Sequence, residues 1–394
     1  MSERRVASRT MFRPGPPLRD FALEVYFARW QTATRHHLAA SDSETLSLTE
    51  LLALAGAEDR EAFRHLALGY GAPRGGERLR RAIAAGYAQA SAEQVLCFSG
   101  AQEAIHTAMH ALLDPGDHAI IILPTYPSTE TIPAGLCAVS GVALDPARGW
   151  TLDIDAVAGA LRANTRLVAI NFPNNPTGKI LERERFDALV ALCRRRGIWL
   201  FSDEVYRLIE RAPALRLPAA VDAYERGLSL GGLAKSFGLP GLRIGWIACR
   251  DGALLQRMER IKHYLSICNA APCERLAAIA LEAGDRILAR NRRIAAENVA
   301  LLGDFLDAHG ALFQWHEPDG GVVGFPRYKG AEGVESFCAR LIERHGVLLL
   351  PASLYRSDLA RLPADRFRIG FGRSDFAAGL EALGAALSEP TPWL

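Results

Sequence analysis

The chain has 394 residues, and roughly 150 residues per domain predicts two or three domains. Hydrophobic residues make up 49% of it and charged residues 23%, which is typical of a folded globular protein and excludes a disordered chain, a collagen, a coiled coil or a membrane bundle. The 46 basic and 44 acidic residues give a net charge of +2. We therefore expect neither nucleic acid nor an anionic membrane as a partner.

Seven cysteines are scattered along the chain, and the spacing of the closest pair, Cys268 and Cys273, is not that of metal ligands. We therefore expect free thiols, no metal site and a reducing, cytoplasmic location. Residues 1–20 contain no apolar core of a signal peptide. The longest apolar runs, such as Ala119–Leu123, are far too short to cross a bilayer.

Short apolar runs alternate with amphipathic stretches through the middle of the chain. Such runs are typical of buried strands, and strand–helix–strand alternation predicts an α/β fold with a mostly parallel sheet and helices on both faces. In chain order, strands are expected at Val95–Phe98, Ala119–Leu123, Leu167–Asn171, Trp199–Ser202, Gly227–Leu230 and Ile244–Ala248, and helices at Gln102–Leu113, Asp153–Ala163 and Glu182–Arg196.

The last third of the chain has the pattern of a smaller α+β unit. Arg286–His309 has apolar residues at helical spacing, a second helix is expected at Gly333–Arg344, and Phe367–Phe371 is expected to form a strand. We expect the N-terminal residues to pack with this unit. The expected domains are a large one at 46–284 and a small one formed by 1–45 with 285–394.

Ligands of an open α/β sheet bind beyond the carboxyl ends of its strands. After the first expected strand, the segment 99–102 (Ser-Gly-Ala-Gln) begins a helix, whose free N–H groups and positive dipole end suit a phosphate. A plain helix cap is the alternative. After the second strand, Tyr126 stands between Pro124 and Pro127, where it either stacks on a flat ring or fills the core.

The next two strand ends carry polar side chains. Asn175 lies in an Asn-Asn-Pro-Thr-Gly segment that can point its amide into a site, although turn chemistry alone also explains the segment. Asp203 ends an otherwise apolar strand, and its burial is costly unless a cation such as a pyridinium nitrogen pairs with it. Tyr206 follows on the same side of a short turn.

The sixth strand region carries an unusual lysine. Lys235 stands among small and apolar residues, eight residues before Arg243. Partial desolvation and a nearby cation both lower the pKa of a lysine towards that of a usable amine nucleophile. A surface position is the alternative for a lysine taken in isolation.

These five segments at strand ends together resemble those of the class I/II aminotransferases, the fold-type I enzymes that use pyridoxal 5′-phosphate (PLP). The resemblance covers most of the chain, and its motifs stand in the family's order and at its usual intervals. It implies a seven-stranded, mostly parallel sheet, PLP as the cofactor and a homodimer. The motifs are Asn-Asn-Pro-Thr-Gly at 174–178, Asp-Glu-Val-Tyr at 203–206 and Ala-Lys-Ser-Phe-Gly-Leu-Pro-Gly-Leu-Arg-Ile-Gly-Trp at 234–246.

The resemblance implies a catalytic role for Lys235, Asp203 and Tyr206. Lys235 resembles the lysine that forms the Schiff base with PLP and moves the substrate proton, and Asp203 resembles the partner that keeps the pyridine nitrogen protonated. Asn175 and Tyr206 resemble the hydrogen-bonding pair at the phenolic oxygen of the cofactor. Tyr126 resembles the aromatic residue that stacks on the ring.

The resemblance also implies a phosphate site and a substrate site. Tyr70 resembles the tyrosine that reaches the phosphate from the neighbouring subunit, so the site is expected to be complete only in a dimer. Arg368, together with Asn175, resembles the site of the substrate α-carboxylate. The phosphate site is expected at Ser99, Gly100, Ala101, Gln102 and Arg243.

Some positions depart from the family pattern. Gly232 stands where many members carry a hydroxyl on the phosphate. Where members often have a Gly-rich turn, the loop near the N-terminus carries Asp42 and Glu44, which either face solvent or meet a basic side chain such as that of arginine. Some relatives, resembling capreomycidine synthase, act on arginine derivatives by β-elimination and cyclisation. Tyr264, expected near the dimer interface, is a further candidate for side-chain selectivity.

The leading interpretation is an aminotransferase that acts on an L-amino acid and a 2-oxo acid. A lyase, a cyclase or a decarboxylase on the same scaffold is the nearest alternative, since fold does not fix reaction. Arg368 argues against decarboxylation because it holds the carboxylate. A PLP-binding regulator is disfavoured by the short segment ahead of the core, and a nicotinamide dehydrogenase by the absence of Gly-x-Gly-x-x-Gly between a strand and a helix.

Overall fold

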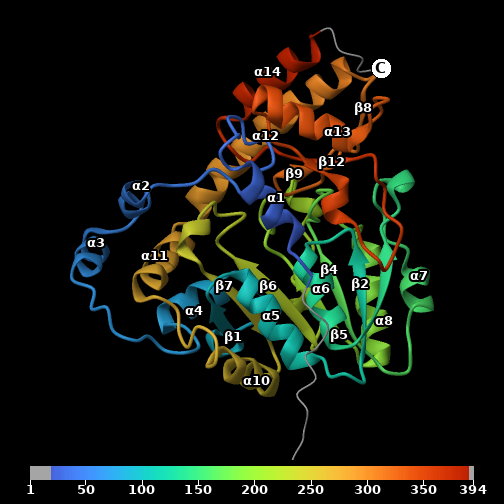
Figure 1. Ribbon diagram of the computed structural model, residues 1–394. Helices are drawn as coiled ribbons and strands as arrows, with labels where there is room; N and C mark the ends of the chain where they lie inside the picture. The colour runs from blue at the N-terminus through green and yellow to red at the C-terminus, as the bar shows by residue number, and fades with distance from the viewer. Residues whose placement is uncertain (1–18, 390–394) are drawn as a thin grey trace, which may run out of the picture.

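The computed structural model describes residues 19–389, and its centre is a seven-stranded sheet (Figure 1). The strand order is β1-β7-β6-β5-β4-β2-β3, and β7 alone in this sheet runs antiparallel to its neighbours. The predicted fold class is thereby confirmed. The strands are β1 (Val95–Phe98), β2 (His118–Leu123), β3 (Ala138–Ala143), β4 (Thr165–Asn171), β5 (Trp199–Asp203), β6 (Gly227–Gly232) and β7 (Gly245–Cys249).

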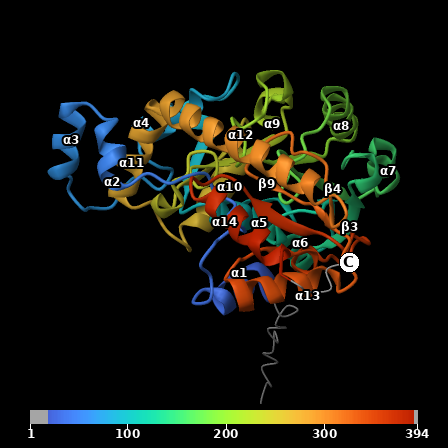
Figure 2. The same cartoon turned by 90° about the horizontal axis from the view of Figure 1, so that it is seen from above.

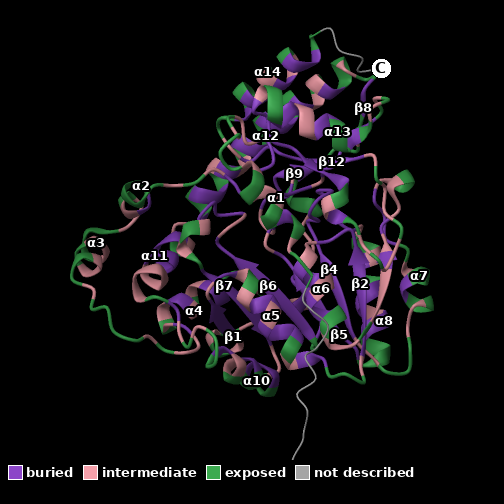
Figure 3. Ribbon diagram, in the orientation of Figure 1, coloured by how far each residue is buried: buried purple, intermediate pink, exposed green. Residues whose placement is uncertain are grey.

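Helices cover both faces of this sheet, and its strands are mostly buried except for the edge strand β3 (Figure 3). Alternate residues of β2 point to opposite faces: Ile120 packs in the cluster that holds Phe186 of α8, and Ile121 in the cluster that holds Ile105 of α5. The helices are α1 (Ala22–Trp30), α2 (Leu48–Ala53), α3 (Ala57–Arg64), α4 (Glu77–Ala84), α5 (Ala101–Leu112), α6 (Pro127–Leu136), α7 (Ile154–Gly159), α8 (Arg183–Arg196), α9 (Ala220–Ala223), α10 (Gly252–Lys262), α11 (Ala271–Glu282), α12 (Gly284–Ala308), α13 (Gly333–Arg340) and α14 (Phe376–Leu387).

Three expectations about elements were wrong in detail. The edge strand β3 was missed because its sequence, Ala-Val-Ser-Gly-Val-Ala, is small, partly polar and only partly buried. The helix expected to reach Ala163 ends at Gly159, since glycine favours helix ends. The helix expected at Gly333–Arg344 is α-helical only to Arg340 and continues as a π-helical turn over Leu341–His345.

The C-terminal part of the chain forms two separate small sheets. Strand β12 (Phe367–Gly370) pairs with β9 (Val323–Gly324) and β11 (Leu350–Pro351), while β8 (Phe313–Gln314) pairs with β10 (Arg327–Tyr328). Residues near the N-terminus join this unit: the N–H of Gly370 donates to the carbonyl of Leu38 at 2.7 Å. This contact supports the proposed grouping of residues 1–45 with 285–394, of which residues 1–18 and 390–394 lie outside the described part.

The helices α2 and α3 project from one side of the molecule, beyond α11 (Figures 1 and 2). No residue of α3 is buried. Residues 44–76, which we call the arm, therefore contain α2, which packs against α11 and buries Leu51, and the more exposed α3 and segment around Tyr70. Within residues 19–389, no helix combines the length and the apolar character that a membrane span requires.

Candidate functional site

The carboxyl ends of β4, β5 and β6 surround a cavity of about 240 Å³, which we call the inner cavity. A wider cavity of about 770 Å³, the outer cavity, is also lined by Lys235 and Tyr126 and contains Arg368 in its wall. The structure thus brings most of the singled-out residues to one place. Those that line the inner cavity are Ala101, Gln102, Tyr126, Asn175, Asp203, Tyr206, Lys235 and Arg243.

Asp203 is the last residue of β5, and only 4% of its surface is exposed. One of its oxygens accepts a hydrogen bond from the N–H of Val205 at 3.2 Å. Burial raises the pKa of Asp203 to about 7, and the charge of Lys235 works in the opposite direction without restoring the ordinary value. A carboxylate held in this way favours a cationic partner inside the cavity.

Lys235 follows β6 and reaches towards the loop at 39–44. Its Nζ donates to the Oγ of Ser41 at 2.7 Å, and the hydroxyl of Tyr206 donates to the carbonyl of the same serine at 2.7 Å. Burial lowers the pKa of Lys235 to about 8; Arg368 lowers it further, while Asp42 and Asp203 raise it. A usable fraction of this amine is therefore unprotonated near neutral pH.

Arg368, on β12, is buried at the wall between the C-terminal unit and the outer cavity. Its Nη1 donates to the hydroxyl of Tyr355 at 2.6 Å and to Oδ1 of Asn175 at 3.2 Å, and its Nη2 donates to the carbonyl of Ala39 at 2.6 Å. Its Nε is buried without a partner in the described part of the chain. A guanidinium with a donor to spare is suited to bind a carboxylate.

The start of α5 and Arg243 form the other end of the inner cavity. Gly100, the N-cap of α5, has φ +96°, and a Cβ at this position would collide with the guanidinium of Arg243. Only glycine therefore allows the close approach that Arg243 makes. Ser99 and Gly100 do not line the cavity, and the N–H of Ser99 is already bound by the carboxylate of Glu103 at 2.5 Å. Donors for an anion here are the helix start at Ala101 and Gln102, and Arg243.

Tyr126 is the N-cap residue of α6 and contributes to the walls of both cavities. Burial raises the pKa of its hydroxyl to about 12. Its ring centroid lies 5.4 Å from that of Phe21, so one part of the ring packs in the core while another faces the cavity. The packing on Phe21 agrees with the core role, and the stacking of Tyr126 on a flat ring stays a prediction.

Tyr70 and Tyr264 lie away from these cavities within their own chain. Their exposed fractions are 90% and 92%, and neither lines the inner or the outer cavity. Leu68, Leu265 and Ile267 are exposed close to them in sequence. Such a set of exposed apolar side chains is typical of a surface that a partner covers.

The two loop acids have partners within the chain. The carboxylate of Asp42 accepts from Nη2 of Arg373 at 2.9 and 3.0 Å, and Glu44 accepts from the N–H and the hydroxyl of Ser374, both at 2.6 Å. Asp42 lines the outer cavity and Glu44 does not. The sequence left open whether these acids face solvent or meet a basic side chain such as that of arginine. Within the described chain Asp42 meets the guanidinium of Arg373 and Glu44 is bound by Ser374, while a contact of either acid with a substrate stays a prediction.

Sequence reasoning missed a second buried lysine. Lys262 is fully buried at the end of α10, and its Nζ donates to the carbonyl of Pro73 at 2.5 Å, the carbonyl of Cys97 at 2.7 Å and Oδ1 of Asn269 at 2.9 Å. These acceptors belong to the arm, to β1 and to the loop after α10. Lys262 thus ties together three segments around the start of α5. The sequence contained a signal for a structural lysine. The chain has only four lysines, and an ammonium group can donate three hydrogen bonds within a small volume.

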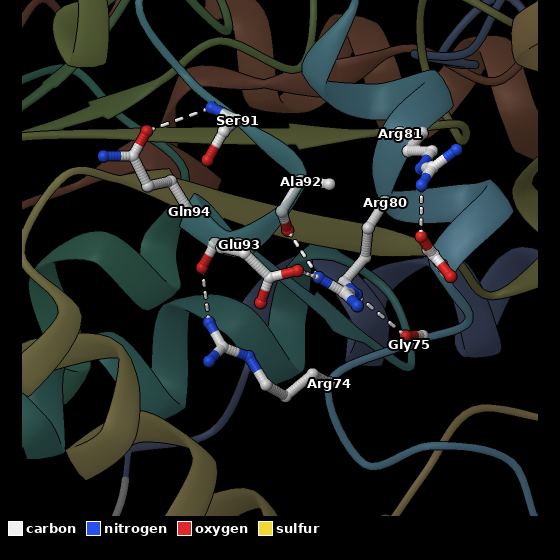
Figure 4. A network of polar contacts seen from close by, with 9 residues as sticks. Arg74, Gly75, Arg80, Arg81, Ser91, Ala92, Glu93 and Gln94 are labelled. Atoms are coloured by element: carbon white, nitrogen blue, oxygen red, sulfur yellow. Dashed lines mark hydrogen bonds and ion pairs between the residues drawn. The ribbon is translucent and has the colours of Figure 1, made fainter.

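Arginines hold the other side of the same arm segment (Figure 4). Arg80 donates to the carbonyl of Gly75 at 3.0 Å and to that of Ala92 at 2.7 Å, and Arg74 donates to the carbonyl of Glu93 at 2.7 Å. The root of the arm is therefore fixed between this network and Lys262. The position of the Tyr70 segment follows from both.

Ser41, Tyr355 and Glu24 were missed as well. Ser41 is separated from Lys235 by 194 residues, and Tyr355 from Asn175 by 180 residues, so no local pattern predicts these contacts. Glu24 lines both cavities from α1. Among the described residues, no group of three or more His, Cys, Asp or Glu side chains is placed to hold a metal ion.

Comparisons with known proteins agree with this geometry. The sequence model of the family described as aminotransferase class I and II matches residues 37–378. Capreomycidine synthase of Streptomyces vinaceus is 32% identical over 388 residues, which cover 95% of this chain and 94% of that protein.

Two solved structures are similar over nearly their whole length. A PLP-dependent aminotransferase from Streptococcus suis has a TM-score of 0.87 at 28% identity and covers 94% of this chain and 98% of its own. The PLP-dependent cyclase OrfR has a TM-score of 0.86 at 30% identity and covers 97% of this chain and 100% of its own. The predicted fold type is confirmed.

The raised pKa of Asp203 predicts that the folded protein without cofactor loses stability as the pH rises. Between an ordinary pKa of 3.8 and the folded value of about 7, the folded protein retains a proton that the unfolded chain releases, so stability falls as pH rises through this range. Asp203→Asn removes the effect. We expect the melting temperature of the variant to exceed that of the wild type by about 3 °C or more above pH 7, with the gap closing towards pH 4. A gap that is constant across this range in thermal melts would contradict the assignment.

Lys262→Met should lower the free energy of unfolding by about 3 kcal/mol or more, because three buried oxygens lose a charged donor. Denaturant unfolding measures this change. Lys329→Met is the control: this lysine is exposed and donates to the carbonyl of Gly310, so we expect a loss below about 1 kcal/mol. Equal stability of the two variants would show that Lys262 does not hold the three segments.

Proposed function

The chain belongs to the class I and II aminotransferase family, whose members depend on PLP, and from this premise we propose that it transfers an amino group between an L-amino acid and a 2-oxo acid. The observation that carries the proposal is the convergence of Lys235, Asp203 and Arg368 on two adjoining cavities. An amine with a lowered pKa, a buried carboxylate and a guanidinium with a free donor are the groups that this chemistry needs.

The residues present fit PLP. Asp203 is a buried carboxylate with a raised pKa, so a pyridinium nitrogen would be its natural partner. The start of α5 with Arg243 offers donors to a phosphate, and the close packing of Arg243 on Gly100 keeps them together. When bound, PLP supplies an electron sink for the bonds at the substrate Cα.

The side chains of the chain itself then have distinct tasks. Arg368 binds the α-carboxylate through its planar guanidinium and so fixes the Cα–H bond relative to Lys235. Lys235, once free of the cofactor, takes the proton from Cα and returns it. Asp203 would keep the ring nitrogen of the bound cofactor protonated, and Asn175 and Tyr206 would hold its phenolic oxygen.

A second candidate is an elimination or cyclisation on the same scaffold. It is favoured by the similarity to capreomycidine synthase over 95% of this chain and to the cyclase OrfR over 97% of it. Arg368 serves such a reaction equally, because the carboxylate is retained. It does not serve a decarboxylation.

We further propose that the enzyme is a cytoplasmic homodimer in which Tyr70 reaches the phosphate of the neighbouring subunit. The projecting arm and the 90% exposure of Tyr70 support this arrangement. Tyr264 and its exposed apolar neighbours would lie in the same interface. All seven cysteines are free, in keeping with a reducing compartment.

A panel of amino acids separates the two candidate functions. The PLP-loaded protein is mixed with each amino acid, and pyridoxamine 5′-phosphate is quantified by chromatography. An aminotransferase converts the cofactor stoichiometrically and recovers it when a 2-oxo acid is added. Release of water or ammonia from the amino acid, with the cofactor unchanged, would identify the elimination or cyclisation instead.

Two variants accompany this test. Borohydride reduction followed by peptide mass spectrometry should find the cofactor on Lys235, and Lys235→Ala should lose this bond. Asp203→Asn should keep the bound cofactor and slow its conversion by a factor on the order of 100. A cofactor bonded to another lysine, or a normal rate in Asp203→Asn, would refute the assigned roles.

The proposed role of Tyr70 across the interface predicts complementation. Tyr70→Ala and Lys235→Ala homodimers should each have little activity. In a hybrid dimer, however, one site combines an intact Lys235 with an intact Tyr70 from the other subunit. We expect a purified hybrid dimer to recover about half of the wild-type activity, since one of two sites is complete. A hybrid as inactive as its parents would place Tyr70 in the site of its own chain or outside any site.

A further inference from the structure

The inner face of helix α1 carries a single charge. The residues of this helix and its C-cap that line the outer cavity are Leu23, Glu24, Phe27, Ala28 and Gln31. Leu23 and Phe27 anchor the helix in the same apolar cluster as Leu348, so this face is held against the cavity rather than free to turn away. Glu24 is thus the one ionised side chain that α1 presents to the site.

Glu24 has no partner of its own. Within residues 19–389 its carboxylate makes no hydrogen bond and no ion pair, whereas Asp42 in the same cavity is bound by Arg373. Glu24 also lines the inner cavity, together with Lys235 and Tyr126, and Asp42 does not. Among the described residues that line the inner cavity, Glu24 and Asp203 are the acids, and Glu24 is the one without a hydrogen-bond donor.

The site has opposite charges in two places. Arg368, whose Nε is unpartnered, lies in the wall of the outer cavity, and Glu24 lies on α1 where the two cavities meet. Resting on the proposed function, we propose that Glu24 is the specificity-determining residue and selects an amino acid whose side chain ends in a cation, a guanidinium or an ammonium group. Arg368 binds the α-carboxylate of this substrate, and Glu24 accepts hydrogen bonds from the cationic end.

The side chain of Arg35 instead favours a substrate whose side chain is negatively charged. It lines the outer cavity and would suit a substrate with a second carboxylate. However, it does not line the inner cavity, and its Nη2 is directed to the carbonyl of Arg344 at 3.5 Å. Glu24 lines both cavities together with Lys235, whereas Arg35 shares only the outer one. A cationic substrate side chain is therefore the better match.

L-Arginine and L-citrulline separate charge from shape, since citrulline replaces the guanidinium by a neutral group of nearly the same size. We expect the wild-type holoenzyme to bind arginine at least about tenfold more tightly than citrulline, the lower end for a charge-assisted hydrogen bond because Glu24 is exposed. Glu24→Gln should reduce this ratio to about one. Because the charge of Glu24 also acts on Lys235, the ratio of the two dissociation constants, and not either constant alone, is the readout. Dissociation constants are measured by titrating the absorbance of the bound cofactor.

Asp375→Asn is the matched control, because Asp375 also lines the outer cavity but not the inner one. It should keep the preference for arginine. A wild-type enzyme without this preference, a preference that survives in Glu24→Gln, or tighter binding of L-glutamate that Arg35→Gln abolishes would overturn the proposal. The binding ratio holds for transamination and cyclisation alike. Failure of the proposed function is seen separately, as a bound cofactor that reacts with no amino acid in the panel.

Discussion

The buried carboxylate of Asp203 is the constraint around which the site is arranged. It lies at the end of the central strand β5, where the sheet and the residues of the inner cavity exclude water, and the N–H of Val205 is its hydrogen-bond donor. A carboxylate that remains ionised in such a place needs a positive charge close by. The chain brings Lys235 near but does not join the two in an ion pair. Burying the ionised carboxylate of Asp203 therefore costs free energy, and a cationic ring bound in the cavity would offset this cost.

The loop at 39–44 connects this constraint to the C-terminal unit. Ser41 accepts from Lys235 and, through its carbonyl, from Tyr206, while the carbonyl of Ala39 accepts from Arg368. Asp42 is bound by Arg373. Lys235, Tyr206 and Arg368 therefore all bind the same loop, so a displacement of the loop would move all three side chains together. This explains why acids that look free in the sequence are engaged in the structure.

The elements that local chemistry determines could be predicted, and the contacts between distant segments could not. Apolar runs located the strands that the sheet buries on both faces, but not β3, which is small and half-exposed at the edge. Polar residues after strand ends located Asp203, Asn175 and Lys235, because parallel strands end at one side of a sheet. The partners of Asp42 and Glu44 lie about 330 residues away. Loop composition has no information on pairing at that distance, which is why the sequence could not identify the partners of these two acids.

Pairing also decides which charges can select a substrate. A carboxylate that already accepts from a guanidinium, as Asp42 does, shapes the loop that holds Lys235, and its replacement would disturb the cofactor contacts as well as any substrate contact. Glu24 makes no such contact in the described chain, and it stands on a helix that precedes this loop. A change at Glu24 therefore removes no hydrogen bond of Ser41 or Arg368, although its negative charge raises the pKa of Lys235. In the proposed arrangement, the residue that reads the substrate side chain is separate from the residues that hold the cofactor, so changes in α1 would alter the choice of amino acid on the same PLP scaffold.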